Sequence, residues 1–520
     1  MNFILYSDVN DRSIRQKIGL PQCSYYFLFR AFLPLFESLG RVHVVSALDE
    51  VDPLYQQLLA AGEGCLFVPF MALHNVPGDL QCPAINVVAW EFGSIPNEPW
   101  GDNPQQDWTL TLAREGRVIA LSSHCAQAIR RAMGADFPVL VLPPPLPEHL
   151  INLCRQSPHQ PVNPGSSLDV TGGIFDSRAL ALSAESLIPP PPLTAEQLAE
   201  IEALRPPPLT LKRRGVIAKH YLRLWALNQG AAQAVPVSRT HFLRLWYWEG
   251  IRDLVPEGLH AWLANTVPAV AGALEVDAPA SRAYPDTSTR VESHVDGVVY
   301  VSVFNPTDGR KNWHQLLTAF CWAFRDTEDA TLVLKFIHSE LPCYYDDVMT
   351  VLAQLSPFAC RVLVVHGYMD EPQYARLCAS ASFYVNASRG EGLCLPLMEY
   401  MACGKPVIAP THTAMQDYVD EKVAFVVAAS EEPTHWPEDE RFLNLTRCYR
   451  PDWGSLKNAY LDSYRMAKER PQDYQRMSDA AVQRMHDYCA LPLLQQRFMD
   501  FLGQAAPARR TTTVTDNTPC

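Results

Sequence analysis

A chain of 520 residues, 48% hydrophobic and 19% charged, has the composition of a globular protein and the length for two to four domains. Its formal net charge of −13 argues against a general affinity for nucleic acid. Its 14 cysteines form no Cys-x-x-Cys pair, and it shows neither a signal peptide nor an apolar run of bilayer length, so we expect a cytoplasmic protein with reduced thiols.

Residues 1–149 predict a first α/β domain, in which short apolar runs alternate with helical stretches. The expected strands are 3–6, 42–45, 65–68, 85–89, 117–121 and 139–142. A helical stretch begins after Gly19 and ends at Gly40. Because a glycine between the first strand and the first helix lets the backbone approach a phosphate, Gly19 is a candidate binding residue, although a simple turn glycine gives the same pattern.

Residues 150–293 predict a proline-rich helical insert. Its expected helices are 194–204, 211–228, 240–254 and 257–274. From Pro206 to Trp248 the chain has no acidic residue. That interval carries basic and aromatic residues, namely Lys212, Arg213, Arg214, Lys219, Arg223, Arg239, Arg244, Tyr221, Trp225, Trp246, Tyr247 and Trp248. We expect either peripheral membrane contact through residues 206–248 or a helical subdomain whose aromatic side chains form its own core.

Residues 294–490 predict a second α/β domain. The expected strands are 297–304, 332–337, 361–365, 383–385 and 407–409. After the strand 383–385, Gly390 and Gly392 predict a loop in which the backbone can approach a ligand closely. Pro396 suits the first turn of a helix, and Gly404 ends that helix. Strand, glycine loop, helix and strand together indicate one unit of a parallel sheet, with the loop at the edge where such sheets bind ligands.

Two carboxylates in this unit are the strongest functional signal. Glu391 lies in the loop and Glu399 in the helix, with seven residues between them, so both can face one crevice. Carboxylates can accept hydrogen bonds from ligand hydroxyls, while the helix N-terminus favours a phosphate. This pattern suits a nucleotide sugar. The same sequence would also result from a surface glutamate in the loop and a glutamate that the helix dipole favours in the first turn of the helix.

The string SRGEG-x-x-LP-x-x-E-x-MA-x-GKPVIA, which begins at Ser388, resembles the signature of family 4 glycosyltransferases. These are retaining enzymes of the GT-B fold, in which two Rossmann-like domains face each other across a cleft. The resemblance implies such an α/β fold here, plus a mainly helical insert. The family's first glutamate contacts the donor sugar and its second contacts the nucleotide ribose, roles that fall on Glu391 and Glu399. The chain departs from the family at Cys394 and Ala414, where glycine is common.

The resemblance also assigns donor-binding residues outside this string. A basic turn contacts the donor diphosphate in the family, and Arg310 and Lys311 match that turn. The segment that begins with His366 and Gly367 resembles the loop beside the nucleotide base. We also expect the backbone of the motif loop to contact the donor, at Gly390, Gly392 and Leu393.

The segment Ala89–Pro96 resembles a Trp-Glu variant of the family, in which this loop lies near the acceptor. Many members carry a catalytic histidine in this region, and this chain has none there. Glu91 is therefore the candidate, either as a catalytic group or as a partly buried, ion-paired glutamate. His124, at the start of a predicted helix, either takes part in catalysis or serves as a capping or core residue.

The expected activity is retaining transfer of a hexose, mannose-like or glucose-like, from a nucleotide-diphosphate sugar to a hydroxyl of a growing glycan or glycolipid. No Asp-x-Asp occurs, so we expect no metal site and no cofactor other than the donor, with Arg310 and Lys311 neutralising the diphosphate. One alternative is a catalytically degenerate scaffold that binds partners through the insert. Another is a sugar-nucleotide epimerase, which would need a different set of loops, or a phosphorylase, for which Lys335 is the nominal pyridoxal-binding lysine.

The end of the chain predicts two further segments. Residues 491–502 are expected to form a terminal helix, because Pro492 suits a helix start and an amphipathic run follows. In the family this helix crosses back to the first domain. Residues 503–520 are polar, with proline and threonine, and are expected to be a disordered tail.

Overall fold

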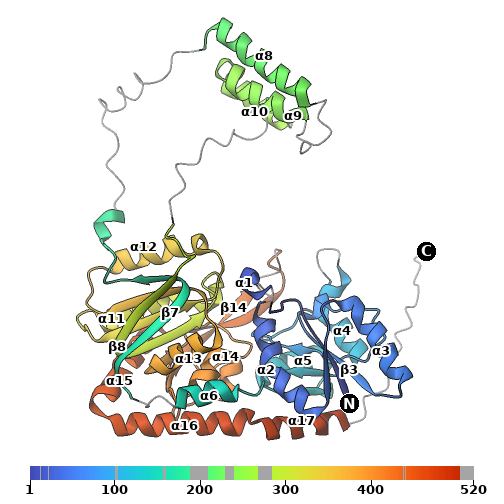
Figure 1. The fold of residues 1–520 in the computed structure, drawn as a ribbon, viewed down its shortest axis with the longest axis vertical. Helices are drawn as coiled ribbons and strands as arrows, with labels where there is room; N and C mark the ends of the chain where they lie inside the picture. The colour runs from blue at the N-terminus through green and yellow to red at the C-terminus, as the bar shows by residue number, and fades with distance from the viewer. Residues whose placement is uncertain are drawn as a thin grey trace. The chain divides into compact units, whose positions relative to one another are not determined.

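The computed structural model describes residues 1–11, 13–20, 23–99, 103–155, 160–187, 209–228, 239–266, 284–436, 439 and 441–503. The chain divides into two compact units, which Figure 1 shows. Unit 1 comprises Met1–Ile188 and Pro285–Cys520, and unit 2 comprises Pro189–Tyr284. Unit 2 is therefore inserted in the sequence of unit 1.

The first part of unit 1 is a Rossmann-like α/β domain with two small parallel sheets, of strand order β2-β1-β3 and β4-β5-β6. Its strands are β1 Asn2–Ser7, β2 Arg41–Val44, β3 Cys65–Phe70, β4 Val87–Val88, β5 Val118–Ala120 and β6 Val139–Val141. Its α-helices are α1 Ile14–Lys17, α2 Cys23–Leu39, α3 Val51–Ala60, α4 Trp108–Glu115, α5 Ser123–Met133 and α6 Glu148–Arg155. Phe3, Ile4 and Leu5 are fully buried, as expected for a parallel strand covered on both faces.

The second part of unit 1 is built on one seven-stranded sheet of order β13-β12-β11-β8-β7-β10-β9, in which β8 also pairs with β9. Its strands are β7 Asn163–Asp176, β8 Arg290–Phe304, β9 Ala330–Phe336, β10 Arg361–Tyr368, β11 Phe383–Val385, β12 Val407–Ala409 and β13 Ala424–Val426. The second half of β8 pairs in parallel with β9 and β11, as a Rossmann-like sheet requires. A separate hairpin joins β14 Ala429–His435 to β15 Leu445–Pro451.

The insert begins later than the sequence suggests. We expected residues 150–293 to be an insert, but β7 pairs antiparallel with both β8 and β10 and so belongs to the second sheet. Residues 163–176 contain one proline, three glycines and two serines, which do not predict a strand. Main-chain pairing with distant strands fixes its place. The compact unit between β7 and β8 is Pro189–Tyr284.

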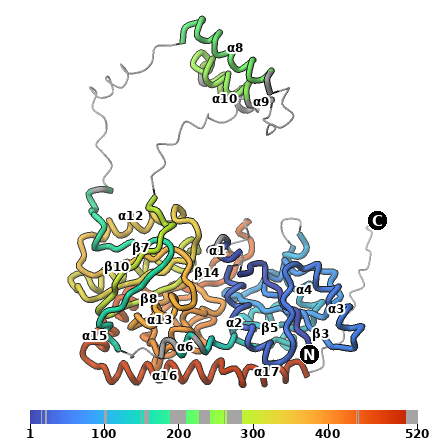
Figure 2. Tube along the Cα trace, in the orientation of Figure 1, coloured from blue at the N-terminus to red at the C-terminus, as the bar shows by residue number. Residues whose placement is uncertain are grey.

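Helices cover the second sheet and connect the two α/β domains. They are α11 Trp313–Ala323, α12 Tyr345–Leu355, α13 Glu371–Ser380, α14 Leu395–Ala402, α15 Trp453–Glu469, α16 Pro471–Cys489 and α17 Leu491–Gly503. Figure 2 shows α16 and α17 running along one side of unit 1 to reach α2. There Phe498 packs against Phe3 and Phe36, with ring centroids 6.1 and 5.5 Å apart. The expected tail beyond Gly503 lies outside the described residues.

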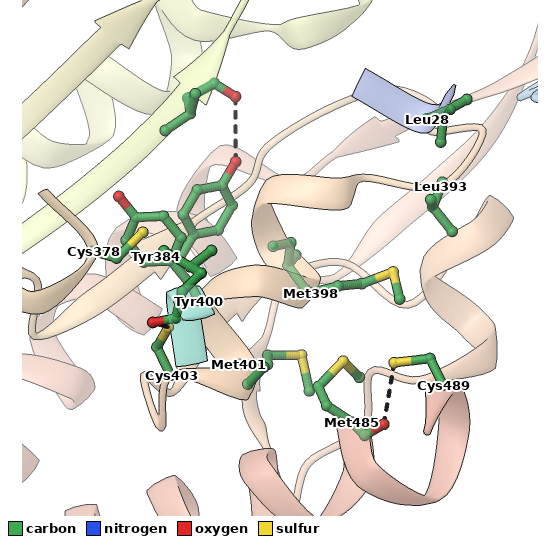
Figure 3. Packing of buried hydrophobic residues seen from close by; sticks show 14 of the residues in the cluster. Leu28, Cys378, Tyr384, Leu393, Met398, Tyr400, Met401, Cys403, Met485 and Cys489 are labelled. Atoms are coloured by element: carbon green, nitrogen blue, oxygen red, sulfur yellow. Dashed lines mark hydrogen bonds between the residues drawn. The ribbon is translucent and has the colours of Figure 1, made fainter. Parts of the chain in front are cut away.

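Helix α14 is buried on most of its surface, and Figure 3 shows this packing. Tyr400 lies against Tyr384 of β11, with ring centroids 4.7 Å apart. Met398 and Met401 are fully buried, and Met485 of α16 belongs to the same cluster. This packing fixes the helix that carries Glu399. The fold is therefore α/β, with two Rossmann-like domains in unit 1.

Unit 2 is helical, with α8 Leu211–Asn228, α9 Arg239–Trp246, a π-helical turn Tyr247–Ile251 and α10 Glu257–Thr266. Arg214 is buried and donates two hydrogen bonds to Asp253, at 2.6 and 2.5 Å. The expected helix 194–204 and the end of the helix 257–274 lie outside the described residues. Among the helices that the structure describes in both units, none is both long and apolar enough to cross a membrane.

Candidate active site

A cavity of about 1760 Å³ lies between the two α/β domains of unit 1. The first domain contributes Gly19 and Glu91 to its wall, and the second contributes Lys311, Glu391 and Glu399. Arg310, Gly392 and Leu393 also line it. The structure therefore brings both carboxylates of the motif and both cations of the basic turn to one cleft.

The glycines of the motif loop allow the two domains to touch. A Cβ atom on Gly392 would lie 3.0 Å from the backbone nitrogen of Trp90 and 3.2 Å from the carbonyl carbon of Ala89. A Cβ atom on Gly390 would lie 3.4 Å from the Cβ of Glu91. We expected these glycines to leave room for a ligand. In this structure the close approach is made by backbone of the first domain.

The carboxylate of Glu391 is buried and accepts hydrogen bonds from four side chains. Lys311 Nζ lies 2.8 Å from each carboxylate oxygen, and an Nη1 atom of Arg310 lies 3.2 Å from one of them. Ser388 Oγ and Asn386 Nδ2 donate to the same carboxylate at 2.6 and 3.1 Å. Burial by itself would raise the pKa of Glu391, but the charges of Lys311 and Arg310 outweigh it and hold the pKa at about 2.

Arg310 joins the two domains through an ion pair with Glu91. Its Nε atom lies 2.7 Å from Glu91 Oε1 and 3.0 Å from Asp308 Oδ2. Its Nη1 atom donates to the carbonyl of Gly390 at 2.9 Å. Burial raises the pKa of Glu91, and Arg310 opposes this effect. Of the two roles left open for Glu91, the structure displays the buried ion pair, and it leaves the catalytic role untested.

Glu399 lies on the cleft side of α14. It accepts a hydrogen bond of 2.7 Å from the hydroxyl of Tyr374, which belongs to α13 and also lines the cavity. Burial, together with the charge of Glu399, raises the pKa of Tyr374 well above its ordinary value, so the hydroxyl stays protonated and keeps donating. The second glutamate is thus held in place by a neighbouring helix.

The Gly19 loop contacts the second domain. Gly19 has a φ of +95°, and its carbonyl accepts a hydrogen bond of 2.7 Å from Asn305 Nδ2 at the end of β8. A Cβ atom there would lie 2.7 Å from the ring of His338. The backbone conformation and the close approach of protein atoms are therefore enough to require this glycine, and its contact with a phosphate stays a prediction.

His366 is turned into the second domain, away from the cleft. Its Nδ1 atom is 2.5 Å from the hydroxyl of Tyr344, and the side chain is 4% exposed. Burial and the nearby Lys335 lower the pKa of His366 to about 4. The carbonyl of Gly367 accepts a hydrogen bond of 2.6 Å from Lys335 Nζ. Neither His366 nor Gly367 lines the cavity, whereas the next two residues, Tyr368 and Met369, do, so the expected contact of this segment with a base stays a prediction.

Sequence reasoning missed several residues that hold the site. Asn386 and Ser388 bond to Glu391, and their position just before it, at the end of a strand, is the signal that could have found them. Lys335, which the sequence offered only as a nominal pyridoxal-binding lysine, lines the cleft, and burial lowers its pKa to about 7. Asp417 reaches the start of α5, where Ser123 N donates to it at 2.7 Å, a long-range contact that no local pattern reveals.

His124 lies behind the Glu91 loop. Burial lowers its pKa, and backbone of Glu91 and Phe92 lies within hydrogen-bond reach. Its Nε2 atom is buried and has no hydrogen-bond partner among the described residues. His124 does not line the cavity, and the two roles that the sequence leaves open for it stay predictions. Among the described residues, no group of three His, Cys, Asp or Glu side chains could hold a metal ion.

Residues 297–438 match the model of the family described as glycosyl transferases group 1. This stretch contains Arg310, Lys311, Glu391 and Glu399, so the second domain is similar to a glycosyltransferase group 1 domain. No curated protein sequence matches the chain significantly.

Solved structures of low identity resemble the chain over nearly its whole length. Sucrose-phosphate synthase from Thermosynechococcus elongatus is 11% identical, with a TM-score of 0.45, over 96% of this chain and 98% of that one. Anabaena HepE, in complex with UDP and glucose, is 12% identical, with a TM-score of 0.46, over 97% and 99%. The trehalose-6-phosphate synthase OtsA is 9% identical, with a TM-score of 0.48, over 98% and 100%. Identities this low say nothing about substrate.

The buried charge of Glu391 predicts an acid-dependent contribution to stability. Its pKa of about 2 in the folded chain lies below its ordinary 4.5, so this contribution is present above pH 4.5 and is lost as the pH falls toward 2. Between about pH 6 and pH 3, the free energy of unfolding should fall by about 2 kcal/mol more in the wild type than in Glu391→Gln. Denaturant unfolding across this range measures the difference.

The control for this experiment is Glu469→Gln, which removes an exposed carboxylate at the end of α15. Its stability should follow the wild-type dependence on pH. Parallel curves for the wild type and Glu391→Gln would show that the ion pairs do not stabilise the charged form of Glu391.

Proposed function

We propose that the chain transfers a sugar from a nucleoside-diphosphate sugar to an acceptor hydroxyl. The observation that carries this proposal is the charged Glu391, buried in a cleft and bonded to Lys311 and Arg310. Burying a carboxylate is costly unless cations and hydrogen-bond donors surround it, so an arrangement this complete in a cleft is typical of a ligand site. The match of this stretch to glycosyl transferases group 1 gives the ligand class.

In this proposal the donor lies against the second domain. Glu391 accepts hydrogen bonds from hydroxyls of the sugar, and Glu399 accepts them from the ribose. Lys311 and Arg310 neutralise the diphosphate, whose negative charge grows as the glycosidic bond breaks, so they replace a metal ion in this role. Backbone of the loop that starts at Gly367 lies beside the base.

Retention of configuration is part of the proposal. Glu391 accepts hydrogen bonds from four side chains, and such a carboxylate is a poor nucleophile. This supports departure of the diphosphate and attack of the acceptor on the same face, with no covalent intermediate on the protein. A hexose donor is proposed from the resemblance of the motif.

The acceptor enters past the first domain. Trp90, Trp108 and Trp436 line the cleft beside Glu91, and aromatic side chains are suited to contact with the apolar face of a sugar ring. We propose a hydroxyl of a glycan or of a lipid-linked glycan as the acceptor. The alternative is a degenerate scaffold, which would bind the nucleotide and release no sugar from it.

Glu399→Gln should weaken binding of the preferred nucleoside diphosphate about tenfold, because a neutral amide replaces a charged acceptor of the ribose hydroxyls, at a loss of roughly 1–2 kcal/mol. Calorimetric titration with uridine, guanosine and adenosine diphosphates measures this. The matched control is Glu371→Gln, which removes another carboxylate that lines the same cleft and pairs with Arg30. An equal loss in both variants, or no loss in Glu399→Gln, would remove the ribose role.

We also propose that unit 2 attaches to an anionic membrane surface. On α8 the exposed Lys212, Lys219 and Arg223 are spaced seven and four residues apart, which places them on one stripe of the helix. Exposed apolar side chains lie on or beside the stripe, with Leu211 86%, Val216 53% and Leu222 70% exposed. Cations beside apolar side chains suit a lipid surface. The buried Arg214 does not belong to this stripe.

Replacing Lys212, Lys219 and Arg223 together by Gln should abolish flotation with vesicles of mixed anionic and neutral lipids, since each cation near such a surface contributes about 1 kcal/mol. The control replaces three exposed arginines of unit 1, Arg447, Arg450 and Arg465, and should float like the wild type. A wild type that fails to float even at low salt would contradict membrane attachment.

A further inference from the structure

More carboxylates than cations meet at the centre of the cleft. Glu91, Asp308 and Glu391 all contact Arg310, and Glu391 also contacts Lys311. The cluster therefore has one negative charge in excess. It also occupies two nitrogens of Arg310, because its Nε faces two carboxylates and its Nη1 faces Glu391 and the carbonyl of Gly390.

A diphosphate cannot simply be added to this cluster. It carries at least two negative charges, and repulsion from a carboxylate at contact distance is strong in a buried site of low dielectric. Because the cluster already has a negative charge in excess, pairing of Arg310 with the diphosphate is favoured when one of its present carboxylate partners leaves or loses its charge. The structure indicates which one.

Glu391 is the least able to yield, since Lys311, Ser388 and Asn386 also bond to it. Asp308 belongs to the same turn as Arg310 and accepts a hydrogen bond of 3.2 Å from its backbone nitrogen. Glu91 comes from the other domain, and within the described part of the chain its carboxylate pairs with Arg310 alone. Glu91 is thus the member of the cluster with the fewest bonds to lose.

We propose that the donor's diphosphate takes the place of Glu91 on Arg310 and that Glu91 binds a proton as it is displaced. This inference rests on the proposed function and assigns Glu91 a specific part in it. In the absence of donor, Glu91 fills the place of a phosphate oxygen and holds the two domains together. With donor bound, the neutral carboxyl no longer repels the diphosphate and can donate a hydrogen bond to it.

The surroundings of Glu91 favour this protonation. Burial raises its pKa, Asp308 and Glu391 raise it further, and Arg310 and Lys311 oppose them. When a diphosphate takes the place of Glu91 on Arg310, Glu91 loses the positive charge that lowers its pKa most. It also gains a negative neighbour that raises its pKa. The pKa of Glu91 must therefore rise when the donor binds, so that binding takes up a proton and weakens as the pH increases.

The other titratable groups near Glu91 do not supply such a proton. On the first domain they are Tyr25, His124 and Cys125. Burial raises the pKa of Tyr25 and of Cys125 and lowers that of His124, so each stays neutral between pH 6.5 and 8.5. On the second domain Asp308, Arg310, Lys311 and Glu391 make up the charged cluster itself.

The test is calorimetric titration of the preferred nucleoside diphosphate between about pH 6.5 and 8.5, a range above the second pKa of a phosphate, which is about 6. The wild-type dissociation constant should increase with pH, by up to about tenfold per unit. Glu91→Gln should bind with no such dependence and about tenfold more tightly than the wild type at the upper end of the range. Titrations in two buffers of different ionisation enthalpy count the protons taken up by the wild type.

The matched control is Glu98→Gln. Glu98 lies in the same loop region and forms an ion pair with Arg441 of the second domain at 3.0 Å, so its loss also removes one charge and one contact between the domains. It should keep the wild-type dependence on pH. A Glu91→Gln variant that keeps this dependence, or a wild type that binds with no proton uptake, would overturn the inference and leave the proposed function standing. A wild type that binds no nucleoside diphosphate at any pH would overturn both.

Discussion

The ion pairs around Glu391 are the constraint on which the rest of the cleft depends. A carboxylate that is 3% exposed would be strongly destabilising by itself, and it is tolerated because two cations and two neutral donors point at it. Those partners come from separate segments, the turn after β8 and the loop after β11. The segments can meet only because β8 and β11 are neighbours in one sheet.

The same requirement explains why the domains approach so closely at this point. Arg310 forms ion pairs with Glu391 of the second domain and with Glu91 of the first. Because Gly390 and Gly392 have no side chains, the backbone of the first domain can lie close to this loop. Gly19 of the first domain also approaches the second domain closely, and Asn305 donates a hydrogen bond to its carbonyl. Charge neutralisation and small residues together therefore set the distance between the two domains.

Local patterns predicted the parts of the site that lie within one strand–loop–helix unit. The sequence predicted the strand 383–385, the loop with Glu391 and the helix with Glu399, because glycine, proline and an apolar run have local conformational effects. The pairing of Arg310 with Glu91, and the strand β7 within the expected insert, depend on contacts between residues far apart in sequence. Such contacts leave no periodic signal in the chain, so they could not be predicted.

The most direct measurement is a crystal structure of the chain with the nucleoside diphosphate that gives it the largest thermal stabilisation, since ligand binding stabilises only the folded state. The account predicts the diphosphate in contact with Lys311 and Arg310, the ribose at Glu399, and Glu91 no longer bonded to Arg310. A nucleotide bound elsewhere, or one bound in the cleft with the Glu91–Arg310 ion pair intact and no phosphate on Lys311, would contradict it.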